Sequence, residues 1–137
     1  MVKPDNFKFI NDTFGHEAGD QTLRILGAAY SEMIGENDAL VRFMGNEFGF
    51  VLINTGREDA LRFAEQLQRM ITNLDISEVI RDADFSITLS IGITVYPDYG
   101  ASAQEIIQKA HELPLIGRAR GGGKILFPED KKETAET

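Results

Sequence analysis

The stretch DNFKFINDTFGHEAGD, residues 5–20, carries more polar side chains than packing requires. Its Asn11 and Asp20 could together recognise a purine, because a carboxylate accepts two N–H donors from the edge of guanine and an amide both donates and accepts. The alternative is that both residues only cap helices. Lys8 could meet a phosphate or be a solvated surface lysine, and His16 lies in a glycine-rich bend typical of a turn.

A second candidate site lies in RFMGNEFGF, residues 42–50. Two apolar stretches flank Gly45-Asn46, a dipeptide suited to the tight reversal of a β-hairpin. Glu47 stands where the chain re-enters a strand, so the predicted tip carries a carboxylate. Either this segment is a plain hairpin, or its tip is a place where a divalent metal could be held.

The apolar spacing predicts the elements that must position these side chains. Helical spacing predicts helices over residues 6–14, 20–34 and 57–73. Alternation predicts strands over residues 39–43, 48–53, 85–96 and 124–127. Asp20 is the expected N-cap of the second helix. Ser102 with Glu105 forms a capping box, and the helix that follows is expected to kink or break at Pro114. The order of elements indicates an α+β fold with an antiparallel sheet covered by helices.

Composition bounds the class of protein. The 137 residues are 42% hydrophobic and 26% charged, which fits one globular domain. We assign this domain to residues 1–128, with residues 74–84 as an acidic loop and 129–137 as a charged disordered tail. The net charge of -8 argues against a basic footprint for nucleic acid. Without cysteine or a long apolar run, the chain is expected to be cytoplasmic and to make no membrane contact.

Three segments are similar, in order and spacing, to the GGDEF domain of bacterial diguanylate cyclases. They are DNFKFINDTFGHEAGD, LVRFMGNEFGFVL and SITLSIGITVYPDYGASAQEIIQKA. The resemblance implies the ferredoxin-like palm of nucleotidyl cyclases and polymerases. It also implies that two GTP molecules are joined into cyclic di-GMP, with each half of a homodimer presenting one GTP. In that family, two divalent metal ions held by carboxylates, Mg²⁺ or Mn²⁺, take part in the reaction.

The resemblance assigns roles to individual positions of this chain. The residues it places at the nucleotide are guanine-recognising Asn11 and Asp20, phosphate-contacting Lys8 and Arg118, and Gly45 of the signature. It places Glu47 on the acidic fourth residue of the signature, which makes Glu47 the candidate catalytic residue.

Departures from the family pattern fall on the metal site. Asn46 replaces a metal-binding acid of the signature, and Lys3 stands where the second metal carboxylate is expected. These changes remove about three units of negative charge from a site for two divalent ions. Asp5 is two residues further along, about 6.6 Å away on a strand. We therefore expect no metal; Asp5 and Glu47 would be the ligands if the domain were active.

Other family features are altered as well. The Arg-x-x-Asp motif of the product-inhibition site is Gly35-Glu36-Asn37-Asp38 here, so its arginine is missing. Met44 replaces the first glycine of the signature, and the last helix contains Pro114. Because only residues 1–4 precede the first motif, the first central strand is expected to be largely missing, unless the chain is a fragment or a partner completes the sheet.

These features lead to one expected function and two alternatives. The first is a degenerate GGDEF domain in cyclic di-GMP signalling, a regulatory or dimerising module that binds GTP weakly and lacks cyclase activity. The second is an active diguanylate cyclase working through Asp5 and Glu47 with Mg²⁺ or Mn²⁺. The third is an interaction domain that binds no nucleotide. The expected partners are a guanine nucleotide and a second copy of the chain, or another GGDEF or sensory domain.

Overall fold

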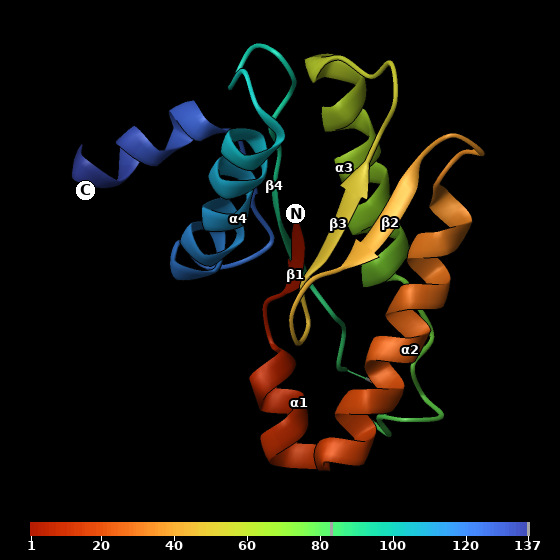
Figure 1. The fold of residues 1–137 in the computed structure, drawn as a ribbon. Helices are drawn as coiled ribbons and strands as arrows, with labels where there is room; N and C mark the ends of the chain where they lie inside the picture. Colours follow the sequence, from red (N-terminus) through yellow and green to blue (C-terminus); the bar gives the residue numbers. More distant parts are fainter. Residues whose placement is uncertain (83, 137) are drawn as a thin grey trace.

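A five-stranded sheet forms the centre of the protein in a computed structural model that describes residues 1–82 and 84–136, with side chains up to residue 132 (Figure 1). The strands are β1 (Val2–Pro4), β2 (Ala39–Arg42), β3 (Phe48–Val51), β4 (Leu89–Gly92) and β5 (Ile125–Leu126). Their order is β2-β3-β1-β4-β5, and all neighbours are antiparallel except β4 and β5. The prediction of an α+β fold with an antiparallel sheet is confirmed.

The first strand is short but lies in the middle of the sheet. Val2 of β1 is in register with Phe48 of β3 on one side and with Ile91 of β4 on the other. With only three residues, β1 matches the expectation that the first central strand is largely missing. It nevertheless joins the hairpin to the other half of the sheet.

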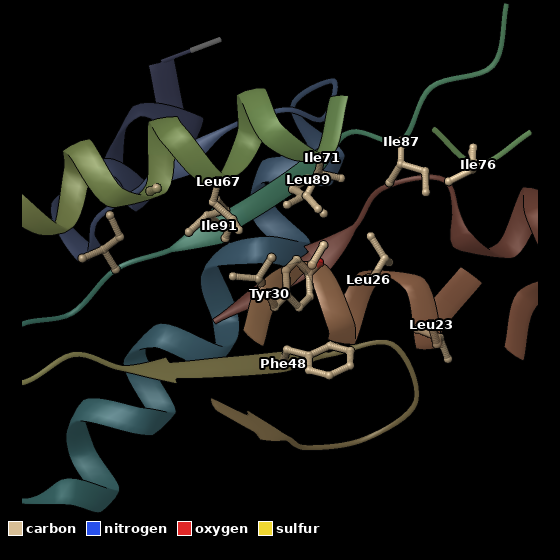
Figure 2. Close-up of a cluster of buried hydrophobic side chains, with 14 of the residues drawn as sticks. Leu23, Leu26, Tyr30, Phe48, Leu67, Ile71, Ile76, Ile87, Leu89 and Ile91 are labelled. Carbon is tan, nitrogen blue, oxygen red and sulfur yellow. The ribbon is translucent and has the colours of Figure 1, made fainter. Parts of the chain in front are cut away.

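Helices cover both faces of the sheet. They are α1 (Phe7–Phe14), α2 (His16–Met33), α3 (Arg57–Thr72) and α4 (Ala103–Ala119). The main core lies between the sheet and the first three helices; Figure 2 shows Leu26 and Tyr30 of α2 with Phe48 of β3. The ring of Tyr30 packs edge-on against Phe48 at 5.1 Å. Within the described residues, no helix is long and apolar enough to cross a membrane.

Several predicted elements are confirmed with nearly the expected bounds. They are the helices α1 and α3, the hairpin of β2 and β3, and the edge strand β5. The capping box also forms: Glu105 donates its backbone N–H to Ser102 Oγ, and its own carboxylate accepts from the N–H of Ala101. Local sequence was sufficient where capping and apolar spacing agreed.

The start of α2 corrects one prediction. The helix begins at His16, so Asp20 lies inside it and is not its N-cap. The reason is Gly15, whose φ of 95° ends α1 and allows the next helix to start at once. The N–H of Gly19 is satisfied by the carbonyl of Gly15 and not by a side-chain cap.

The course of α4 corrects a second prediction. Pro114 lies inside this helix, which continues to Ala119 without a break. A proline removes one backbone donor and its ring crowds the preceding turn. Here β4 makes room for it with Gly92, where an added Cβ would lie 2.5 Å from Leu113 Cβ and 2.6 Å from the carbonyl oxygen of Ala110. The missing side chain at Gly92 lets this part of α4 sit directly on the sheet.

The strand predicted over residues 85–96 is much shorter in the structure. Only Leu89–Gly92 forms β4, because the neighbouring β1 has three residues with which to pair. Ile87 and Ile93 are still buried, which explains the long alternation in the sequence. The loop predicted over residues 74–84 contains residue 83, which lies outside the described residues, and the rest forms no helix or strand.

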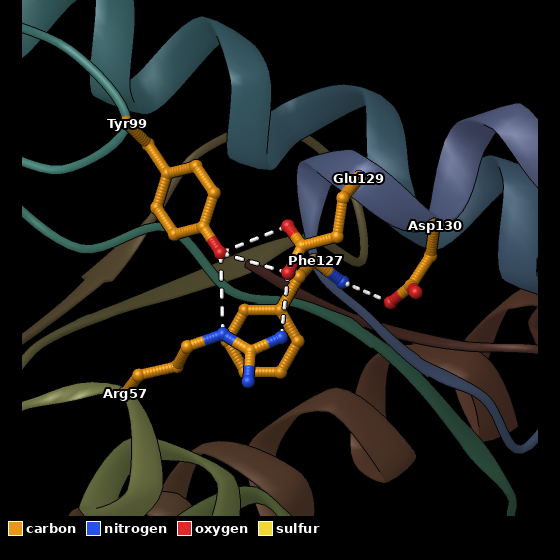
Figure 3. A network of polar contacts seen from close by, with 5 residues as sticks. All are labelled: Arg57, Tyr99, Phe127, Glu129 and Asp130. Atoms are coloured by element: carbon orange, nitrogen blue, oxygen red, sulfur yellow. Dashed lines mark hydrogen bonds and ion pairs between the residues drawn. The ribbon is translucent and has the colours of Figure 1, made fainter.

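The segment predicted as a disordered tail begins with residues that contact the domain. A 3₁₀ helix, η1, spans Pro128–Glu136. Figure 3 shows the carboxylate of Glu129 between Arg57 of α3 and the hydroxyl of Tyr99. The guanidinium of Arg57 also lies 3.9 Å above the ring of Phe127. Charge pairing and aromatic contact therefore hold the beginning of η1.

Candidate functional site

The two predicted guanine-recognising residues lie where α1 meets α2. The side chain of Asn11 lies against Gly19, so closely that an added Cβ at Gly19 would lie 1.8 Å from Asn11 Oδ1. Asp20 follows Gly19 on α2 and is exposed. The fold therefore brings the Asn11 amide next to the residue that precedes Asp20, eight positions further along the sequence.

The predicted phosphate-contacting residues lie on different helices. Lys8 is exposed on α1, one turn before Asn11. Arg118 is exposed near the end of α4, which packs on β4. Lys8 thus belongs to the same helix as the amide, while Arg118 comes from a separate element.

The tip of the hairpin is a tight turn, as its sequence predicted. Gly45 has a φ of 56°, and the N–H of Glu47 donates to the carbonyl of Met44 at 3.0 Å. The guanidinium of Arg42 donates to the carbonyl of Gly45, which further fixes the turn. Met44 is 82% exposed, so a long apolar side chain stands at the tip where the family signature has a glycine.

Glu47 is turned inward from this tip. It is 2% exposed, and its Oε1 lies 2.5 Å from Nδ1 of His111 on α4. Burial lowers the pKa of the Met1 amino group to about 6, and the nearby Glu47 carboxylate opposes that fall. The Glu47 carboxylate therefore contacts the imidazole of His111 and lies near the amino group of Met1.

Asp5 is engaged in a network at the end of β1. Its Oδ1 accepts the hydroxyl of Ser90 at 2.5 Å, and its Oδ2 accepts the hydroxyl of Thr88 and the N–H of Gly123. Gly123 belongs to a glycine turn with positive φ values that closes over this carboxylate. Asp5 thus joins β1, β4 and the segment before β5.

These surroundings do not fit a pair of divalent cations. Val2 pairs with Phe48 in an antiparallel register, so the next residue of β1, Lys3, lies opposite Glu47. Lys3 brings an ammonium, Asn46 a neutral amide, and the Asp5 carboxylate already has three donors. In the part of the chain that the structure describes, no three His, Cys, Asp or Glu side chains are grouped so that they could hold a metal.

The remaining acid of the product-inhibition motif has a local structural role. Asp38 accepts the N–H of Ile53 through Oδ1 and that of Gly35 through Oδ2, both at 2.9 Å. These two hydrogen bonds hold the pKa of Asp38 below its ordinary value. Asp38 thereby ties the end of α2 to the end of the hairpin.

A cavity of about 250 Å³ is lined by none of the predicted site residues. It is lined mainly by apolar side chains of the sheet, α3 and α4, among them Phe50, Phe63, Leu67, Ile93 and Ile106. Neither Asn11 nor Asp20 lines it. Its lining is unlike the polar surroundings that a triphosphate needs.

Sequence reasoning missed the partners of the two carboxylates. His111 was not among the predicted site residues, and its contact with Glu47 joins positions 64 apart. Ser90 offered a weak signal, because it is a polar residue inside an otherwise buried strand. The roles assigned to Asn11, Asp20, Lys8, Gly45 and Arg118 remain predictions.

Comparison with known proteins places the chain among its relatives. A family model described as "Diguanylate cyclase, GGDEF domain" matches residues 1–121. Diguanylate cyclase DosC of Escherichia coli K12 is 31% identical over 91% of this chain, and the cyclic di-GMP phosphodiesterase PdeB of Shewanella oneidensis is 31% identical over 93%. The chain spans only 27% of DosC and 15% of PdeB.

The fold agrees with the sequence match. The crystal structure of the GGDEF domain of YfiN (TpbB) from Pseudomonas aeruginosa superposes with a TM-score of 0.82 at 27% identity. The match covers 92% of this chain and 78% of that structure. On both grounds, the chain belongs to the GGDEF domain family of the diguanylate cyclases.

Proposed function

We propose that this chain is a degenerate GGDEF domain of cyclic di-GMP signalling, which binds a guanine nucleotide weakly and regulates or dimerises without cyclase activity. The guanine base lies between Asn11 and Asp20, and Lys8 reaches toward the phosphates. The domain works in the cytoplasm, where GTP is present. Its partners are a second copy of the chain, another GGDEF domain or a sensory domain.

The state of the metal positions carries this proposal. A cyclase of this family needs carboxylates free to bind divalent ions, whereas here Glu47 is buried against His111 and Asp5 accepts three hydrogen bonds. Lys3 adds a positive charge beside them. Mg²⁺ prefers anionic oxygen in near-octahedral geometry, which these groups do not offer.

Asn11 lies against Gly19, the residue before Asp20, and this supports the proposal that the domain binds a nucleotide. An amide and a carboxylate together match the donor and acceptor pattern of a guanine edge. Binding is weak because the metals that would hold the triphosphate are missing, and Lys8 alone provides a single flexible charge.

Incubation of the purified chain with GTP and either Mg²⁺ or Mn²⁺ tests the catalytic part. Chromatography is expected to show GTP unchanged. Formation of cyclic di-GMP that disappears in Glu47→Gln would overturn the proposal and establish the alternative, an active cyclase that uses Asp5 and Glu47.

Titration calorimetry with GTP, GDP and cyclic di-GMP tests the binding part. GTP and GDP are expected to release heat with the wild-type chain, and Asp20→Ala should abolish this signal. Asp12→Ala is a matched control, because Asp12 is an exposed acid on α1 close in sequence to Asn11. If no nucleotide binds, the chain is the interaction domain that binds no nucleotide. If nucleotide binds and both variants behave alike, the role assigned to Asp20 is wrong.

A further inference from the structure

The carboxylate of Glu47 is an unusual group to find inside a small domain. The residue is 2% exposed and lies immediately before β3, on the side covered by α4. Taking a carboxylate out of water is costly unless hydrogen bonds or an opposite charge compensate. Something must therefore compensate Glu47 in the folded chain.

The compensation comes from α4. His111 Nδ1 lies 2.5 Å from Glu47 Oε1, and the imidazole is 57% exposed, so one partner is buried while the other reaches in from the surface. The same helix is brought close to the sheet by Gly92, which leaves room for Leu113 and Pro114. The close approach of α4 thus allows a side chain of this length to reach the carboxylate.

We infer that the contact between Glu47 and His111 is a clasp that closes the hairpin onto α4 in place of a bound metal. In this arrangement, the imidazole is the partner of the oxygen Oε1 that a cation would otherwise need as a ligand. Lys3, at the adjacent position of β1, adds a second obstacle for a divalent ion. The hairpin stays against α4 because the Glu47 carboxylate has His111 as its partner.

The clasp rests on the part of the proposed function that leaves these positions without metal, and it is independent of nucleotide binding. It predicts that the wild-type chain is equally stable with EDTA and with Mg²⁺. It also predicts a strong coupling between two residues 64 positions apart. The first experiment below tests for a metal beside Glu47, and the second measures the coupling between Glu47 and His111.

The first experiment needs no variant, because the chain has only two histidines, His16 and His111. In NMR spectra without nucleotide, the Nδ1 proton of His111 is expected to be protected from exchange with water, while the exposed His16 is not. Substoichiometric Mn²⁺ should leave the His111 signals as sharp as those of His16. Selective broadening of His111 would mean that a metal binds beside Glu47, which would overturn both the clasp and the metal-free site.

The second experiment is a double-mutant cycle in thermal unfolding. His111→Ala and Glu47→Gln should each lower Tm, the former on the order of 10 °C because it leaves a buried carboxylate without a partner. The double variant should lose much less than the sum of the two. His16→Ala is the control and should leave Tm unchanged. Additive losses would refute the clasp and leave the proposed function standing.

Discussion

Two glycines of α2 offer a direct test of how Asn11 is positioned. Gly19 and Gly27 lie in the interior of the same helix, where alanine is favoured by roughly 1 kcal/mol. At Gly27 an added Cβ would meet only the ring of Phe48 at 3.7 Å, an ordinary contact. At Gly19 it would lie 1.8 Å from Asn11 Oδ1, so the amide must leave its position.

The expected free energies follow from this difference. Gly27→Ala should stabilise the domain by about 1 kcal/mol. Gly19→Ala has the same gain in helix propensity, but displacing the amide costs about 1–3 kcal/mol. Its net effect should range from nearly zero to about 2 kcal/mol of destabilisation. Urea unfolding of the two variants measures the difference directly.

A third variant isolates the cause. Asn11→Ala combined with Gly19→Ala removes the clash, so its stability relative to Asn11→Ala alone should rise as in Gly27→Ala. Calorimetry with GTP should show that Gly19→Ala binds as poorly as Asn11→Ala, while Gly27→Ala binds normally. If Gly19→Ala alone were as stabilising as Gly27→Ala, the reasoning about Asn11 would be refuted.

Three further predictions concern single residues. Asp5→Ala should cost about 2–3 kcal/mol in urea unfolding because three donors lose their common acceptor; a change under about 0.5 kcal/mol would contradict this. Gly92→Ala should cost about 3 kcal/mol in the same assay, because α4 would be pushed off the sheet. Gly56→Ala, which meets nothing within 4 Å but changes the N-cap of α3, should cost no more than about 1 kcal/mol; equal effects would contradict the packing argument. Since the folded-state pKa of Asp38 is lowered, its contribution to stability is present above its unfolded pKa and declines as pH falls through the folded pKa. Wild type should therefore lose more Tm between pH 7 and about pH 3 than Asp38→Asn; equal losses would argue against it.

The elements that local sequence determines were predictable. The hairpin followed from Gly45 between apolar stretches, and the start of α4 followed from the capping box of Ser102 and Glu105. The family resemblance then gave the topology of the sheet, which local patterns alone do not specify. Prediction succeeded where neighbouring residues carry the information.

The remaining features depend on contacts between distant segments. Pro114 predicts a broken helix when it is considered alone, and only Gly92, 22 positions earlier, explains why α4 continues. Asp20 has the residue type of an N-cap, but the positive φ of Gly15 starts the helix before it. The partners of Glu47 and Asp5 were missed for the same reason, since each contact crosses more than 60 residues.

The direct junction of α1 and α2 at Gly15 has a mechanical consequence. From this junction α2 runs as one continuous helix of 18 residues, about 27 Å long, with Asp20 near its first end. Its other end leads to Asp38, which is bonded to the end of the hairpin. Asp20 and the end of the hairpin that follows β3 therefore lie at the two ends of one continuous helix.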